Sequence, residues 1–203
     1  MTRVADIFRR TDAAAGAEFA LVLPLLILLI FGVIDVGRYM WTLNEVEKAT
    51  QMGARTAVVT TMVPTDLAAK NFGVALGQGA QIPTSSFGGM QCTSNGTTAT
   101  CTCVSNCSGI GTTADSTAFN LIADRMALFA GMIGRPNVQI TYMNSGLGYA
   151  GDPTGPDVAP IVTVSAVNVG FTSLIGQFFG ISLRLPTVSA SLTLEDGQGS
   201  FSN

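Results

Sequence analysis

The sequence predicts an α+β protein in which a long N-terminal transmembrane and amphipathic helix packs on a small antiparallel sheet with one further helix. Three observations support this fold class. Residues 19–34 form an uncharged apolar run. A helical repeat of small and apolar side chains then continues to about residue 59. Three later segments alternate apolar and polar residues with the period of a half-buried strand.

The apolar run is long enough to form a membrane anchor. As a helix its length is roughly 24 Å, slightly less than the ~30 Å hydrocarbon core. We place the transmembrane segment at residues 17–37, which brings Glu18 to the membrane edge, where an ionisable group is costly and by default marks function. A cleaved signal peptide is the alternative. The helical sequence continues and no clean small-x-small cleavage site follows the run, which favours an uncleaved anchor.

Charged and aromatic residues beside the run predict its orientation. The basic residues that precede it are Arg3, Arg9 and Arg10. The N-terminus is therefore expected in the cytoplasm and the rest of the chain outside it. Tyr39 and Trp41 follow the run, where aromatic rings favour the headgroup layer. Asp35 and Arg38 are one turn apart and are expected to form a solvated ion pair.

The helix is expected to continue past the membrane. Its narrow stripe repeats at spacings of three and four through Tyr39, Leu43, Val46, Thr50, Gly53 and Ala57. We predict one helix from near Ala14 to Val59, within a helical region of residues 14–61, whose outer half packs on the head of the same chain. Residues 1–13 then form a cytoplasmic leader and residues 62–203 an exported head.

The cysteines are consistent with export. All four lie in a polar segment, residues 84–114, which is expected to be an exposed insertion held by disulfides: Cys92, Cys101, Cys103 and Cys107. Three connectivities are open. A hairpin loop at residues 95–98 would place Cys92 opposite Cys101, and would leave Cys103 and Cys107 for a second bond. A zinc site is the competing hypothesis, although Cys101 and Cys103 are too close in sequence for the usual ligand spacing.

The remaining elements of the head follow from periodicity. Helices are expected at residues 66–76 and 116–134, the second capped by Asp115 or Ser116 and ended by Gly134. Strands are expected near residues 138–142, 162–166 and 188–194, with a bulge after Ala166. Apolar residues at helical spacing over 171–179 predict a short helix that caps the sheet core or, as the less favoured alternative, rests on the bilayer surface.

Composition and motifs argue against several function classes. The chain has no histidine, so Ser-His-Asp, Cys-His and His-metal sites are excluded. Charged residues make up 11% of the chain and the net charge is −3, which offers no basic surface for nucleic acid. The acids show no paired spacing, and Asp152 and Asp157 are interpreted as solvated turn residues. We expect no enzymatic activity, cofactor, metal or small-molecule substrate.

Three stretches of the N-terminal half resemble a known family. They are EFALVLP at residues 18–24, GVIDVGRY at 32–39 and GAR at 53–55. Charged, proline and glycine positions occur together in the order found in the TadE-like pilus assembly proteins of the bacterial tight-adherence (Tad) machinery. The resemblance covers roughly residues 14–59. The cysteine-containing middle of the chain shows no such resemblance.

The resemblance implies a pseudopilin or minor pilin of a Flp-type pilus, with a pilin-like fold and a single pass through the bacterial inner membrane. It implies cleavage by a leader peptidase between Ala13 and Ala14, which makes Glu18 the fifth residue, although Ala13 stands where the family usually has glycine. Glu18, Phe19 and Pro24 are then the expected assembly contacts. The implied partners are other pilin-like subunits and the inner-membrane assembly platform.

Two interpretations of Glu18 remain open. Its carboxylate pairs with the N-terminal amine of a neighbouring subunit, or it reaches the headgroup layer and pairs with nearby arginines or water. Pro24 removes one helical hydrogen bond, which a lone span tolerates as a kink. The alternative function is a membrane-tethered extracytoplasmic binding or adhesion module that acts through residues 84–114 and has no role in pilus assembly.

Overall fold

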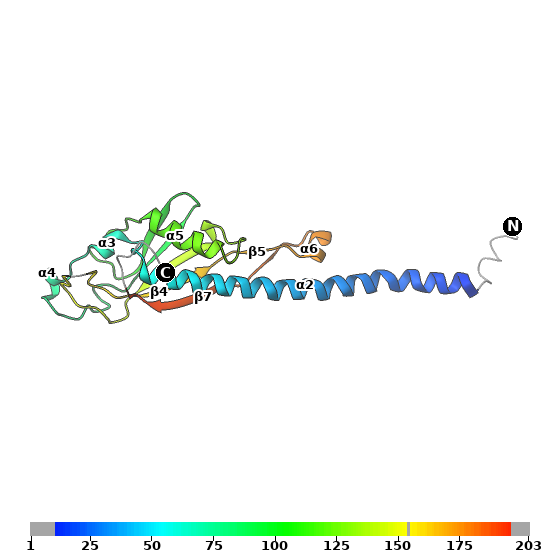
Figure 1. Ribbon diagram of the computed structural model, residues 1–203, viewed down its shortest axis with the longest axis horizontal. Coiled ribbons are helices and arrows are strands. Elements are labelled where there is room, and N and C mark those ends of the chain that lie inside the picture. The colour runs from blue at the N-terminus through cyan, green and yellow to red at the C-terminus, as the bar shows by residue number, and fades with distance from the viewer. Residues whose placement is uncertain (1–10, 154, 196–203) are drawn as a thin grey trace. The chain divides into compact units, whose positions relative to one another are not determined.

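The computed structural model describes residues 11–153 and 155–195. It confirms the α+β class, with one long N-terminal helix and a five-stranded antiparallel sheet (Figure 1). The chain divides into two compact units. The first, which we call the apolar unit, comprises Met1–Trp41 and Phe171–Leu183, and the second, the head, comprises Thr42–Gly170 and Arg184–Asn203. Of the expected leader at residues 1–13, residues 1–10 lie outside the described residues.

Helix α2, Thr11–Val59, is a single helix of 49 residues and contributes to both units. Straight-chain and small residues dominate it, and its only proline is Pro24, which removes one backbone donor without ending the helix. The large hydrophobic side chains on both sides of Pro24 are mostly exposed and do not form a buried core. The prediction of one continuous helix that ends at Val59 is confirmed.

The head is built on a sheet with the strand order β2-β1-β3-β4-β7, in which every neighbouring pair is antiparallel. The strands are β1 (Gly89–Ser94), β2 (Ala99–Ser105), β3 (Val138–Met143), β4 (Ile161–Ala166) and β7 (Val188–Thr193). The register places one residue of each strand in a single row, namely Cys101, Cys92, Ile140, Val164 and Ala190. Alternation along each strand therefore produces one shared apolar face.

The outer half of α2 packs within the head, as predicted. The expected stripe is buried over its last part, where Val46, Thr50 and Ala57 have almost no exposed surface. Gly53 shows how closely the elements approach: an added Cβ would lie 2.7 Å from Cγ of Met126 on helix α5 (Ser116–Ala127) and 3.1 Å from Cγ1 of Val164 on β4. Only a residue without a side chain fits this contact between two helices and a strand.

Helix α5, Ser116–Ala127, begins as the sequence predicted. The carboxylate of Asp115 accepts hydrogen bonds from the amides of Thr117 and Ala118, which caps the first turn. The helix ends seven residues before the expected Gly134, which instead precedes the short 3₁₀ helix η1 (Arg135–Asn137). Tight turns at residues 128–133 still bury Ile133, so the apolar periodicity extends beyond the helix itself.

Two expectations for the middle of the chain are wrong. The helix expected at residues 66–76 is two short turns, α3 (Thr65–Ala68) and α4 (Gly73–Leu76). The segment 84–114 is not simply an exposed insertion, because it supplies strands β1 and β2, and β1 lies between β2 and β3. Met90 and Cys92 on β1 are fully buried. Polar composition hid these strands, since few apolar residues mark their inner face.

The expected bulge after Ala166 is also absent. Strand β4 ends there, and Asn168 adopts a positive φ of 54°, so the change of phase marks a turn out of the sheet. The chain then forms β5 (Gly170–Phe171), α6 (Leu174–Phe179) and β6 (Leu183–Arg184) before it reaches β7. Strands β5 and β6 pair as a separate two-stranded sheet.

Candidate functional site

The most unusual surface of the molecule is the apolar half of α2. The described chain contains one helix that is long and apolar enough to cross a membrane, Ala15–Val59, and almost none of its apolar stretch is buried. Large side chains are exposed on every face, including Phe19 at 64%, Leu21 at 76% and Leu29 at 64%. Contiguous apolar surface of this extent marks a membrane or protein interaction site. The helix is compatible with a single-pass membrane anchor.

At the end of this stretch, Asp35 is buried, with 8% of its surface exposed. Its carboxylate accepts three hydrogen bonds from the segment 171–183: from Oγ of Ser173 at 2.6 Å, and from the amides of Leu174 and Ile175 at 2.9 Å each. Arg38 lies farther away, with its guanidinium nitrogen 3.4 Å from the carboxylate. The expected Asp35–Arg38 ion pair is therefore present, but Asp35 is buried instead of solvated, and its shorter hydrogen bonds come from residues 138 to 140 positions away.

These contacts cap helix α6 completely at its N-terminus. The first amides of a helix have no partner within it. Here Leu174 and Ile175 donate to Asp35, Gly176 donates to Oγ of Ser173, and Gln177 donates to the carbonyl of Ser173. The Ser173 hydroxyl thus donates to Asp35 and accepts from Gly176. No amide of the first turn of α6 requires water.

The C-terminus of α6 is closed in a similar way. Gly180 adopts the left-handed conformation, with a φ of 68°, which favours glycine. Its amide and the amide of Ile181 both donate to the carbonyl of Gly176, the second at 2.7 Å. This arrangement is a Schellman-type ending, which turns the chain without leaving those amides unpaired.

An aromatic contact lies one turn beyond Asp35. The rings of Tyr39 and Phe171 meet edge to face, with centroids 5.3 Å apart. The guanidinium carbon of Arg38 lies 5.8 Å from the centroid of the Phe171 ring, within the range of a cation–π contact. Phe171 is buried by these neighbours. The segment 171–183 is thus held to α2 by a buried carboxylate and by an aromatic pair.

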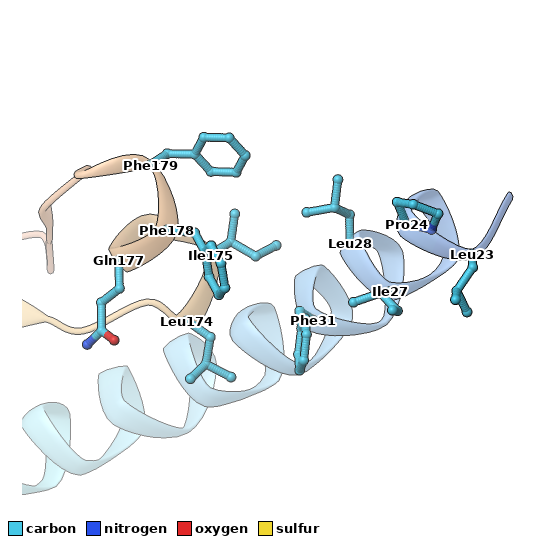
Figure 2. Close-up of a pocket in the computed structure, with 10 residues that line it drawn as sticks. All are labelled: Leu23, Pro24, Ile27, Leu28, Phe31, Leu174, Ile175, Gln177, Phe178 and Phe179. Atoms are coloured by element: carbon cyan, nitrogen blue, oxygen red, sulfur yellow. The ribbon is translucent and has the colours of Figure 1, made fainter. Parts of the chain in front are cut away.

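Between α6 and α2 there is an open apolar groove of about 770 Å³ (Figure 2). It is lined from α2 by Leu23, Pro24, Ile27, Leu28 and Phe31, and from α6 by Leu174, Ile175, Gln177, Phe178 and Phe179. The side chain of Ile175 points toward α2, and the ring of Phe179 lies farther from the α2 ribbon, at the edge of the groove. An added Cβ at Gly32 would lie 3.7 Å from Cδ1 of Ile175, an ordinary contact distance.

The structure separates the residues that the sequence predicted to act together. Pro24 lines the groove, whereas Glu18 and Phe19 are exposed and do not line it. The proposed cleavage position between Ala13 and Ala14 lies in the first turns of α2, and their side chains are outside the described ones. Their roles in assembly and processing stay predictions.

Helix α6 differs from the favoured expectation. The sequence analysis placed the apolar residues 171–179 as a cap on the sheet core, but the segment belongs to the same compact unit as the apolar half of α2. Ser173 before an apolar helical run is a recognisable capping signal. Nothing local in the sequence connects it to Asp35, so the contact between them was missed.

The cysteines form two disulfides, Cys92–Cys101 and Cys103–Cys107. The first joins opposite residues of the β1–β2 hairpin, with Cα atoms 4.0 Å apart, in the register that a loop at residues 95–98 implies. Asn95 closes that loop through a backbone bond to Thr98. Because all four thiols are paired, none is a thiolate ligand in this structure, and the zinc hypothesis gains no support.

Acidic groups in the head have structural partners. Asp157, expected as a solvated turn residue, is 4% exposed and accepts hydrogen bonds from the amides of Phe72, Gly151 and Asp152. A two-pronged hydrogen bond from Arg135, at 2.8 and 2.9 Å, keeps the pKa of Asp124 below its ordinary value. Among the described residues, no three His, Cys, Asp or Glu side chains gather in a way that could hold a metal ion.

Tyr142 is the largest fully buried side chain of the head core. Its hydroxyl accepts a hydrogen bond from the amide of Val63 at 3.2 Å, and its ring stands on the inner face of β3. Burial raises the pKa of the Tyr142 phenol well above its usual range, because the phenolate would lose its hydration. This tyrosine is a structural tie between β3 and the chain after α2.

The geometry defines a class of protein, an α+β head carried on a helix whose other half is apolar and exposed. Residues 13–55 match the family model described as TadE-like protein. The match covers the apolar half of α2 and most of its buried half, which confirms the resemblance noted in the sequence. A search of curated proteins and a search of solved structures each found no match.

Proposed function

We propose that this protein is a pseudopilin or minor pilin-like component in the assembly of a Flp-type (Tad) pilus. It acts through association of α2 with the helices of other pilin-like subunits and with the inner-membrane assembly platform. The observation that carries the proposal is the TadE-like match at residues 13–55, which coincides with the exposed apolar half of the helix.

The physical basis is the lack of any intrachain partner for most of this surface. Side chains such as Leu21, Leu25 and Val33 are 67–76% exposed, so the helix can present any face to a neighbouring helix in a membrane or fibre. Gly37 adds a position where an extra Cβ would meet no heavy atom within 4 Å. Small residues of this kind allow two helices to approach closely.

Glu18 gives the proposed association its register. Its exposed carboxylate sits at the start of the apolar stretch, where a cationic group on a neighbouring subunit would be attracted more strongly than in water. Each partner also loses hydration, so the pair selects an arrangement more than it adds stability. A newly exposed N-terminal amine is the proposed cation, supplied by a leader peptidase that cuts between Ala13 and Ala14.

The test replaces Glu18 by Gln and measures pilus production together with co-purification of pilin-like subunits. Glu47→Gln is the matched control, because Glu47 is an exposed glutamate on the same helix but in the head unit. We expect assembly to fall in Glu18→Gln and to stay normal in Glu47→Gln at equal protein levels. Normal pili in both variants would remove Glu18 from the mechanism.

We further propose that the N-terminus is cytoplasmic and that the head is periplasmic. The basic residues at 3, 9 and 10 support this orientation, as do the two disulfides, which persist in oxidising compartments. Protease treatment of spheroplasts is expected to degrade the β1–β2 hairpin while residues before α2 stay protected. N-terminal sequencing of the mature chain tests processing, with Ala14 as the expected first residue.

The proposed role is non-enzymatic. A second candidate, a tethered adhesion module, is favoured by the exposure of β2, whose last four residues face solvent at the edge of the sheet. Deleting residues 84–114 cannot separate the two, because that would remove β1 from the middle of the sheet. Val104→Asp, at an exposed edge position, is a sharper test: loss of surface adhesion with intact pili would favour the adhesin.

A further inference from the structure

The segment 171–183 has three properties that the proposed pilus function does not use. It contains no charged residue, most of its apolar side chains are exposed, and its helix α6 is capped at both ends. Phe178 is 89% exposed, Phe179 is 64% exposed and Ile181 is 57% exposed. Such neighbouring large side chains are unfavourable in water, because full burial of each contributes roughly 1.5–3 kcal/mol.

We infer that the segment 171–183 is a second membrane-embedded element, which dips into the half of the bilayer nearer Asp35 and binds lipid acyl chains with α6 and the groove beside it. This inference rests on the membrane anchor in the proposed function and adds a lipid-binding surface to it.

The position of the groove along α2 supports this depth. Its lining on α2 runs from Leu23 to Phe31, within the residues 17–37 assigned to the span. From Asp35 to Leu23 the helix rises about 18 Å, and half of the hydrocarbon core is about 15 Å thick. A segment fastened at Asp35 and facing Leu23 therefore lies at hydrocarbon depth wherever α2 spans the bilayer.

The capping of α6 supports an environment without water. Backbone groups in the hydrocarbon must be satisfied within the protein. The amides of residues 174–177 have partners in Asp35 and Ser173, and those of Gly180 and Ile181 donate to Gly176. In water these amides could bond to solvent instead. The buried carboxylate of Asp35 thus makes a six-residue helix compatible with the membrane.

The distribution of apolar side chains favours lipid over a protein partner. Ile175 points toward α2 (Figure 2), whereas Ile181 and Leu183 do not line the groove and are 57% and 42% exposed. A single partner helix seated in the groove would leave Ile181 and Leu183 uncovered, whereas acyl chains surround an embedded element on all sides. The surface is also continuous with the exposed apolar side chains of α2, for which lipid is the proposed solvent.

The test measures the depth of a tryptophan placed on α6. The chain has one tryptophan, so Trp41→Phe provides a silent background. Phe178→Trp and Phe179→Trp report on the two sides of α6. Leu29→Trp, at 64% exposure on α2, is the membrane control, and Val74→Trp, at 93% exposure on α4, is the aqueous control. The full-length protein is reconstituted in phosphatidylcholine vesicles that carry bromine atoms at defined depths of the acyl chains.

We expect bromolipid to quench both α6 reporters by at least half as much as it quenches Leu29→Trp, and to leave Val74→Trp unquenched. Quenching of Leu29→Trp alone, with both α6 reporters emitting as in water, would overturn the inference and leave the anchor intact. Unquenched but blue-shifted α6 reporters would show a protein partner in place of lipid and would also overturn it. Absence of quenching at Leu29→Trp would contradict the membrane anchor itself.

Discussion

The two halves of α2 differ in how apolar side chains are distributed around the helix, although they form one continuous helix. In the head, residues 46–58 show a stripe of buried small and apolar side chains, and the remaining faces are polar. In the apolar unit, residues 19–34 show no stripe, because apolar side chains occupy every face. An amphipathic pattern indicates a protein core on one side and water on the other. A uniformly apolar pattern indicates one apolar surrounding, which this chain does not itself provide.

The comparison also explains the use of polar residues. The head satisfies its buried polar groups through long-range bonds inside its own core, as at Tyr142 and Asp157. The apolar unit buries one carboxylate, Asp35, and uses it to cap α6. The hydrogen bonds from Ser173, Leu174 and Ile175 offset the cost of burying the charge of Asp35. Four changes would test or sharpen the contrast between the two units.

The largest effect is expected from charges in the middle of the span. Replacing Leu26 and Leu29 together by Arg should cost about 6 kcal/mol of membrane insertion, since Arg at the centre of a span is unfavourable by about 3 kcal/mol. Membrane flotation of the variant is the measurement, and the protein should leave the membrane fraction. The double change to Ala is the control and should still float. Flotation of the Arg variant would argue that α2 does not span.

A smaller effect is expected at Asp35. Asp35→Ala removes a charged acceptor from three donors, and hydrogen bonds to charged groups contribute about 1.5–3 kcal/mol each without full additivity. Hydrogen exchange at the amides of Leu174 and Ile175 should accelerate by about 100-fold, which corresponds to ~2.8 kcal/mol. Amides of β3 should not change. Equal acceleration in β3 would show that the two units do not open separately.

The third change compares two glycines of α2. Gly53→Leu should destabilise the head by about 2 kcal/mol, because its Cβ alone would meet Met126 and Val164 at 2.7 and 3.1 Å. Gly37→Leu should leave head stability unchanged, since no heavy atom lies within 4 Å of its added Cβ. Thermal unfolding in detergent, followed by near-UV circular dichroism, gives both values. Similar losses in the two variants would contradict the division of the helix into two environments.

The smallest effect concerns a surface pair of the head. The hydrogen bond from Arg135 lowers the folded-state pKa of Asp124 below 3.8, so its stabilisation is present above about pH 4 and is lost as the pH falls through the folded-state pKa. Both side chains are more than a third exposed, which limits the contribution to below about 1 kcal/mol.

Asp124→Asn should therefore lower the free energy of unfolding slightly at pH 7 and by less at pH 2, as measured by urea denaturation. Glu47→Gln, which alters an exposed acid of α2, provides the control for the general effect of removing one negative charge. If the difference in free energy of unfolding between Asp124→Asn and the unchanged protein grew toward low pH, Arg135 would not be the partner that stabilises Asp124.

Local sequence patterns predicted the helices and strands in which residues face the core at a regular spacing. The stripe through Val46, Thr50 and Gly53 predicted the buried face of α2, and alternation predicted β3, because each second residue faces the core. The hairpin of β1 and β2 was misinterpreted as an exposed insertion. Its inner face includes Met90, Cys92 and Cys101. The two cysteines were counted as disulfide residues of a polar loop instead of as residues of a sheet.

The sequence by itself determined that the chain has a long helix with one apolar half and a small antiparallel sheet, since helix length and strand period are local properties. Only the tertiary structure decided that Ser173 and the amides of α6 meet Asp35, and that the polar segment 84–114 supplies a central strand. Both depend on residues far apart in the chain, whose contacts are selected by the satisfaction of buried polar groups and by the packing of a shared face.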